Sequence, residues 1–162
     1  MLELRKRYEA VSREVSLGLA GLCRKISRFS CPCCGYPTLD SRAGYDICRL
    51  CNWEDDGQDD ADAAERSGCN HGYTLEAARE NFSKYGTMYT PDNNPTISGG
   101  DSAGRVQLKR ELVAVYGAML AAPGGTMPRL WRRALKIEKA LSREQAQRIR
   151  EYEKSLERGV AR

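Results

Sequence analysis

Two pairs of cysteines are the residues in this chain best suited to chemistry. Each pair has the Cys-x-x-Cys spacing, and thirteen residues separate the pairs. One tight turn with that spacing aims two thiolates at a single ion, and the connection is long enough for the chain to return to the same place. The pattern therefore predicts a structural zinc site with the ligands Cys31, Cys34, Cys48 and Cys51. Four thiolates at about 2.3 Å leave no open position on the metal, so we expect no catalysis at the ion.

The residues around the pairs support tight turns. Pro32 stiffens the first turn, and Gly35 and Asn52 follow the second cysteine of each pair, where a positive φ lets backbone N–H groups point at sulfur. Cys33 lies between two ligands, and we expect a small buried thiol, with a redox-active cysteine as the alternative. Cys23 is expected in the core.

A second group of metal-binding side chains is an open alternative. Cys69 and His71, the one histidine of the chain, form a Cys-x-His pair in a glycine-flanked turn. A second site would need further ligands, and Asp59, Asp60 or Asp62 could supply them. The simpler interpretation of His71 is a hydrogen-bonded turn residue.

An acidic segment follows the second cysteine pair. Residues 53–62 carry six carboxylates and one tryptophan. Oxygen ligands suit Mg²⁺, but no phosphate-binding glycine loop or nucleophile motif accompanies them, which favours a solvated loop that meets a basic partner. The binding residues that we predict are Trp53, Asp55, Asp56, Asp59 and Asp60.

Charge is unevenly distributed along the 162 residues, although the formal net charge is only +4. Lys and Arg outnumber Asp and Glu by four in residues 1–30 and by six in residues 91–162, whereas residues 31–90 have an acidic excess of six. Seven cysteines, an odd number, fit reduced and metal-bound thiols better than disulfides. No secretory signal or membrane-spanning stretch is visible, so we expect a cytoplasmic protein without a membrane role.

Periodicity predicts the elements that position these residues. Apolar residues at three- and four-residue steps indicate one packing helix over residues 4–29, and further helices over 75–85, 108–119 and 130–141. Thr74 is a plausible N-cap and Gly86 a terminator for the second of these. Ser142 with Gln145 is a capping-box signature, which predicts a separate last helix. Between the cysteine pairs, Thr38–Ser41 and Tyr45–Cys48 suggest a β-hairpin.

The predicted fold class is mostly α with a small β-hairpin zinc ribbon (α+β), that is, a zinc-knuckle module flanked by amphipathic helices. We expect four regions. They are an N-terminal amphipathic helix (1–29), a zinc-ribbon-like domain (30–88), a linker loop rich in Pro, Gly, Asn and Asp (89–104) and a C-terminal helical region (105–162).

The ordered motifs of residues 30–88 resemble those of the bacterial cysteine-rich CPCC family. They are Cys31-Pro32-Cys33-Cys34-Gly35-Tyr36, Tyr45-Asp46-Ile47-Cys48 with Cys51, Trp53-Glu54-Asp55-Asp56-Gly57-Gln58, and Leu75-Glu76-Ala77-Ala78-Arg79-Glu80-Asn81-Phe82 with Tyr85-Gly86. The resemblance implies a small bacterial zinc-binding module and a loose association with toxin and immunity genes. It implies no reaction, and Arg49, Asn52 and the Cys69-Asn70-His71 turn depart from the family pattern.

Three classes of function follow from these features. The leading hypothesis is a non-enzymatic zinc-binding protein-interaction module, such as an inhibitor or immunity protein that blocks a toxin through its acidic surface. The alternative is a nucleic-acid-binding zinc-ribbon protein. A metal-dependent hydrolase or thiol redox enzyme that uses Asp59, Asp60, Cys33 or His71 ranks last, because spacing pairs no acid with a base. The phosphate-contacting residues of the second hypothesis would be Arg129, Arg132, Arg133, Lys136 and Lys139. The sequence leaves the partner and the oligomeric state open.

Overall fold

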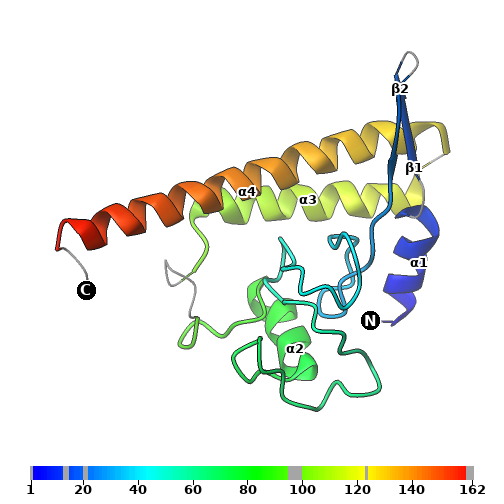
Figure 1. Ribbon diagram of the computed structural model, residues 1–162. Helices are drawn as coiled ribbons and strands as arrows, with labels where there is room; N and C mark the ends of the chain where they lie inside the picture. Colours follow the sequence, from blue (N-terminus) through cyan, green and yellow to red (C-terminus); the bar gives the residue numbers. More distant parts are fainter. Residues whose placement is uncertain (1, 13–14, 20–21, 95–99, 123, 160–162) are drawn as a thin grey trace.

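Four α-helices are the main regular elements of the structure, a computed structural model that describes residues 2–12, 15–19, 22–94, 100–122 and 124–159. Within these residues, a mostly helical fold is confirmed. Figure 1 shows two long helices side by side, with the cysteine-rich loops and a shorter helix beneath them. In chain order the elements are α1 (Leu2–Ser12), β1 (Val15–Leu19), β2 (Leu22–Ile26), α2 (Leu75–Tyr85), α3 (Ala103–Ala121), the 3-10 turn η1 (Gly124–Thr126) and α4 (Met127–Glu157).

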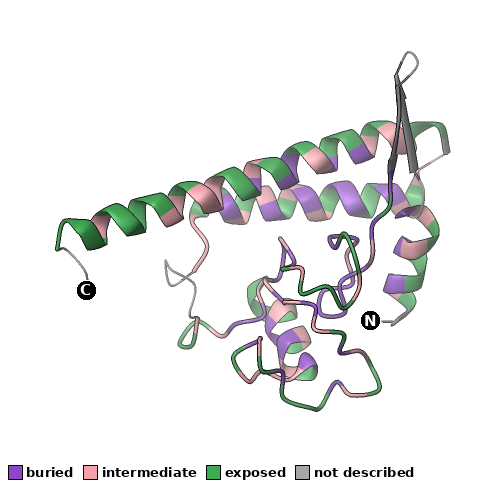
Figure 2. Ribbon diagram, viewed as in Figure 1, coloured by how far each residue is buried: buried purple, intermediate pink, exposed green. Residues whose placement is uncertain are grey.

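The helices α3 and α4 form an antiparallel pair (Figure 1). Apolar residues recur along each helix at three- and four-residue steps, so each turns one stripe toward the interior. Helix α3 begins at Ser102, whose hydroxyl accepts a hydrogen bond of 3.0 Å from the N–H of Arg105. Because the helices are antiparallel, the C-terminal turns of α4 extend beyond the N-terminus of α3. Among the described residues, these turns have no neighbouring helix, and they are mostly exposed (Figure 2). The buried stripe residues are Leu112, Val115, Tyr116 and Met119 on α3 and Trp131, Ala134, Ile137 and Leu141 on α4.

Helix α4 is continuous, so the prediction of a separate last helix at Ser142 is wrong. The Ser142 hydroxyl donates a hydrogen bond of 3.0 Å to the backbone carbonyl of Glu138, one turn earlier in the same helix. No glycine or proline lies between Pro128 and Gly159, so nothing interrupts the backbone hydrogen bonds there. None of the described helices combines the length and apolar character that a membrane crossing requires.

The N-terminal segment is a helix followed by a hairpin, so the prediction of one helix over residues 4–29 is wrong. Helix α1 ends at Ser12, whose hydroxyl donates to the carbonyls of Tyr8 (2.7 Å) and Arg28 (3.2 Å). Strands β1 and β2 then pair in antiparallel register, from Val15 opposite Ile26 to Leu19 opposite Leu22. The side chains of residues 13–25, including the predicted core residue Cys23, lie outside the described part of the structure.

Helix α2 has the boundaries that the sequence predicts. The Thr74 hydroxyl accepts a hydrogen bond of 3.1 Å from the N–H of Ala77, which caps the first turn. At the other end, Gly86 has a φ of 71°, and its N–H donates to the carbonyl of Phe82 at 2.9 Å. Hydrogen bonds between residues close in sequence therefore set both ends of this helix. Its buried residues are Leu75, Ala78 and Asn81.

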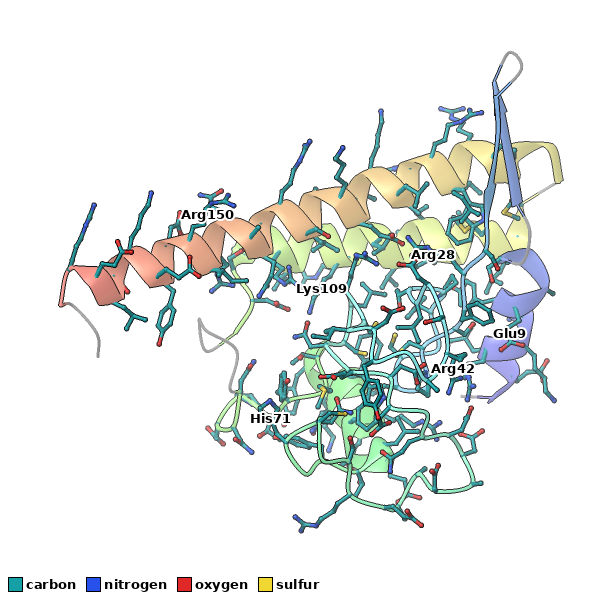
Figure 3. The ribbon with its side chains drawn as sticks, in the orientation of Figure 1. Glu9, Arg28, Arg42, His71, Lys109 and Arg150 are labelled. Atoms are coloured by element: carbon teal, nitrogen blue, oxygen red, sulfur yellow. The ribbon has the colours of Figure 1, made fainter. Side chains whose placement is uncertain are left out.

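Tyrosine rings and a buried carboxylate join the cysteine-rich loops to the helix pair. The ring centroid of Tyr36 lies 5.5 Å from that of Tyr8 on α1 and 5.9 Å from that of Tyr116 on α3. Glu138 on α4 accepts hydrogen bonds from the Tyr116 hydroxyl (2.6 Å) and from Arg28 (2.7 Å). Burial raises the pKa of Glu138, whereas Arg28 and Tyr116 favour its charged form. Figure 3 shows Arg28 between the helix pair and these loops.

Candidate metal centre

The first cysteine pair lies at the tip of a narrow backbone ladder. Phe29 and Leu39 exchange two backbone hydrogen bonds (2.9 and 3.1 Å), and the N–H of Cys31 donates to the carbonyl of Tyr36 (2.9 Å). The chain turns between them, and the N–H of Gly35 donates to the carbonyl of Cys31 (2.9 Å). Gly35 has a φ of 80°, the positive value expected after the second ligand.

The second pair repeats this arrangement. The N–H of Cys48 donates to the carbonyl of Trp53 (2.8 Å), and that of Asn52 donates to the carbonyl of Cys48 (2.9 Å). Asn52 has a φ of 68° and occupies the position of Gly35 in the first turn. Further along this ladder, the N–H of Tyr45 donates to the carbonyl of Asp55 (3.0 Å).

The predicted hairpin between the cysteine pairs is wrong, because each pair has its own ladder. Leu39 pairs backward with Phe29, and residues 45–48 pair forward with 53–55. These pairings are isolated bridges and turns rather than regular strands. The zinc ribbon with a central β-hairpin is therefore replaced by two knuckles that face each other.

The two knuckles bring four thiols together, as predicted. The sulfur atoms of Cys31, Cys34, Cys48 and Cys51 all lie within 4.8 Å of one another, and all four residues are buried. The sulfurs of Cys31 and Cys51 are 3.6 Å apart, as are those of Cys34 and Cys48. A tetrahedron with metal–sulfur bonds of about 2.3 Å has edges of about 3.8 Å. Four thiol sulfurs at this spacing therefore fit the tetrahedral coordination of one metal ion.

The protonation of these thiols depends on burial and on one another. Burial raises the pKa of the Cys31, Cys34 and Cys51 thiols, because the surroundings do not solvate a thiolate. Burial also raises the pKa of the Cys48 thiol, but hydrogen bonds from the other three thiols have a larger effect, and the pKa of Cys48 is lowered. A metal ion must displace the protons of the remaining thiols when it binds.

A hydroxyl that sequence reasoning missed contacts one of the four sulfurs. The Oγ1 atom of Thr38, a buried residue, lies 3.0 Å from the sulfur of Cys48. When Cys48 is a thiolate, it can only accept this hydrogen bond, so Thr38 donates it. Thr38 lies next to Leu39, which pairs with Phe29 in the first ladder. This backbone pairing places the Thr38 hydroxyl beside Cys48, and the spacing of the cysteines does not predict it.

Cys33 is buried, as expected, and is not one of the four clustered thiols. Burial raises the pKa of its thiol, the opposite of what a redox-active cysteine needs. Both observations favour the expected small buried thiol over a redox-active cysteine.

Among the described residues, no second group of three or more potential ligands comes together. The Cys69 thiol contacts Ser67 (3.4 Å) and Asp56 (3.6 Å), and burial raises its pKa. His71 is exposed, and its ring packs 5.9 Å from that of Tyr89. A cavity of about 560 Å³ between the second knuckle and α4 is bordered by Cys69 and His71, but not by Asp59 or Cys33. This cavity therefore brings Cys69 and His71 together without Asp59, Asp60 or Cys33.

Two of the five predicted binding residues lie in the interior. Trp53 and Asp55 are both 0% exposed. The Oδ2 atom of Asp55 accepts hydrogen bonds from the N–H of Ala43 (2.8 Å) and from Nε of Arg42 (3.0 Å). Asp55 therefore orders the preceding loop, and it is not part of a surface as predicted.

The other acidic residues of the segment are partly or fully exposed, and two of them pair with arginines. Asp59 forms ion pairs with Arg5 and Arg42, and the hydrogen bonds from Arg5 lower the pKa of its carboxyl well below the usual range. Asp60 pairs with Arg79 on α2, while Asp56 accepts a hydrogen bond of 2.6 Å from Ser67. The side chains of Asp59 and Asp60 each remain 40% exposed. Figure 3 shows Arg42 within this region.

Residues 29–98 match the family described as Cysteine-rich CPCC. The match extends beyond residue 88, where the sequence resemblance was expected to end, and it leaves α1, α3 and α4 outside. No curated protein and no solved structure matches the chain.

Proposed function

Because residues 29–98 are a cysteine-rich CPCC domain, we propose that this chain is a non-enzymatic zinc-binding protein that binds another protein through its acidic segment. The observation that carries the proposal is the buried cluster of four cysteine sulfurs within 4.8 Å. Thiolate sulfur in tetrahedral spacing suits Zn²⁺, which has no geometric preference of its own and no redox chemistry.

The role of zinc in this proposal is structural. A bound ion supplies the charge that keeps four thiolates together in a buried site and ties the two knuckles to each other. Four protein ligands leave no position for a substrate. Turnover at the metal is therefore not part of the function.

The second knuckle carries the acidic segment, which supports a link between metal and partner binding. The backbone of Asp55 pairs with that of Tyr45 and Asp46, directly beside Cys48. The side chain of Asn70, a buried residue, accepts a hydrogen bond from the N–H of Glu54 (2.8 Å) and donates one to its carbonyl (2.9 Å). Loss of metal should disorder this support and weaken partner binding.

The surface that would meet the partner consists of the carboxylates that stay accessible. Asp59 and Asp60 are each 40% exposed on their side chains, and Glu65 is exposed. Ion pairs with arginines orient the two aspartates without covering them. A toxin with a basic active-site cleft is the class of partner that this surface fits.

Two matched variants test this surface. D60N/E65Q removes two accessible charges, whereas E151Q/E153Q removes two exposed charges from α4. Photo-crosslinking from benzoylphenylalanine placed at the exposed Ala61 should capture one partner protein. The D60N/E65Q variant should bind that partner about fivefold more weakly than the wild type, a loss of about 1 kcal/mol. Equal binding by both variants and the wild type would remove the acidic segment from the proposal.

A further inference from the structure

The exposed face of the first half of α4 carries positive charge alone. Between Met127 and Arg143, every fully exposed residue is basic except Ser142. The acidic residue of this stretch, Glu138, is buried and bonded to Arg28 and Tyr116. The exposed basic residues, called here the α4 basic face, are Arg129, Arg132, Arg133, Lys136, Lys139 and Arg143.

Helical geometry places these six residues in one row. At 100° per residue they fall within an arc of about 120°, and at 1.5 Å per residue the row from Arg129 to Arg143 is about 21 Å long. The opposite side of the helix packs through Trp131, Ala134 and Leu141. Figure 3 shows nitrogen-tipped side chains that project from α4 away from the cysteine-rich loops. The basic and apolar residues that alternate in the sequence of this segment therefore lie on opposite sides of the helix.

In the described structure, five of the six residues lack the acidic partners that usually neutralise a surface helix. In the described part of the chain, no ion pair joins an acidic side chain to Arg129, Arg133, Lys136, Lys139 or Arg143. Like charges at i and i+4 destabilise a helix by about 0.2–0.5 kcal/mol per pair. The later part of the same helix differs, since exposed Glu151, Glu153 and Glu157 are interspersed with its cations. A polyanionic ligand would offset the repulsion in the first half.

We infer that the α4 basic face binds the phosphate backbone of a nucleic acid duplex, without reading base sequence. Four of its six cations are arginines, whose planar guanidinium groups match phosphate oxygens in pairs. A row of about 21 Å follows about six base-pair steps of 3.4 Å. This surface is separate from the acidic segment, and it differs from a zinc ribbon that itself contacts nucleic acid.

Other anionic partners fit this face less well. A helix that lies in a membrane interface presents large apolar residues to the lipid, whereas here the apolar face is buried against the protein interior. An acidic protein would also attract cations, but a row of one sign along 21 Å matches the regular charge of a phosphate backbone better.

The test is the binding of the zinc-loaded full chain to fluorescein-labelled 20-base-pair duplexes of two unrelated sequences, measured by fluorescence anisotropy. About five phosphate contacts predict a slope of about −4.5 for log affinity against log salt concentration. Affinity should then fall about 500-fold between 50 and 200 mM salt, and equally for both sequences. No binding at 50 mM salt, or a flat salt dependence, would overturn the inference.

Two variants with the same change in net charge locate the surface. The face variant is R129Q/R133Q/K136Q/K139Q, and the control is K6Q/R7Q/R66Q/R110Q, whose four cations are exposed elsewhere. The face variant should reduce affinity at 100 mM salt by about 100-fold and bring the slope close to −1, whereas the control should change affinity by less than about threefold. Glutamine is a good helix former, so zinc content and circular dichroism should be unchanged.

A charge-preserving variant and two further ligands complete the test. K136R/K139R should bind the duplex as the wild type does, because the charge is retained. Equal losses in the face variant and the control would overturn the inference, since net charge alone would then explain binding. Face-dependent binding to phosphatidylserine vesicles or to polyglutamate, without binding to the duplex, would assign the face to a membrane or to an acidic protein and would overturn it as well.

Discussion

Replacing Thr38 with valine should weaken metal binding through the loss of one hydroxyl. The Thr38 Oγ1 atom lies 3.0 Å from the Cys48 sulfur, and both residues are buried. Valine keeps the shape of threonine but cannot donate a hydrogen bond. A buried hydrogen bond to a charged group contributes about 1.5–3 kcal/mol. A loss of about 2 kcal/mol corresponds to a fall of about 30-fold in zinc affinity.

The assay is competition for zinc with a chromophoric chelator at pH 7, together with the absorption spectrum of the Co²⁺-substituted protein. Thr38→Ser keeps the hydroxyl and is the matched control, so its affinity should stay within about threefold of the wild type. In Thr38→Val, the sulfur-to-cobalt charge-transfer bands should shift as well, because the Cys48 thiolate loses its donor. If valine and serine give the same affinity and unshifted bands, the hydroxyl does not support the metal centre and the reasoning is refuted.

Three further predictions concern protons, the helix pair and the second knuckle. Zinc binding at pH 7 should release protons, because burial raises the pKa of three of the four thiols, so the apparent affinity should fall as pH falls; calorimetry in buffers of different ionisation enthalpy measures the number of protons released, and release of none contradicts the prediction. Tyr116→Phe should lower the free energy of unfolding by about 1–3 kcal/mol in urea titrations, because Glu138 loses a buried donor, and an unchanged value would show that the contact contributes nothing. Asn52→Ala should cost about 1 kcal/mol more than Asn52→Gly, since the φ of 68° suits glycine, and equal stabilities would remove the argument from backbone conformation.

The cluster of four cysteines was predictable because its geometry is local in sequence. Two Cys-x-x-Cys turns, each followed by a residue that tolerates positive φ, specify both knuckles. The same holds for α2, where Thr74 and Gly86 act on backbone groups within one turn. Such features need no knowledge of distant parts of the chain.

Two of the wrong predictions of secondary structure concern sequence patterns that are compatible with more than one element. The stripe through residues 4–29 has helical spacing, but Val15, Leu17 and Leu19 also alternate with Ser16 and Gly18 as a strand does, and residues 15–19 are β1. The capping-box pattern at Ser142 is equally compatible with the interior of a helix when nothing before it breaks the helix.

The acidic segment was misjudged in part for a different reason. Its carboxylates pair with Arg5, Arg42 and Arg79, which lie on α1, on the loop between the knuckles and on α2. The backbone ladder of the second knuckle carries Asp55 into the interior, where Arg42 and the N–H of Ala43 bind it. Pairings across such sequence distances depend on how the elements pack, and composition alone counts every carboxylate as exposed.

X-ray absorption at the zinc edge, on protein whose zinc has been quantified by elemental analysis, tests the central claim most directly. We predict one zinc ion per chain with four sulfur neighbours at about 2.3 Å and no oxygen or nitrogen neighbour. Fewer than four sulfurs, a bound water, or a folded chain that holds no stoichiometric metal would contradict it.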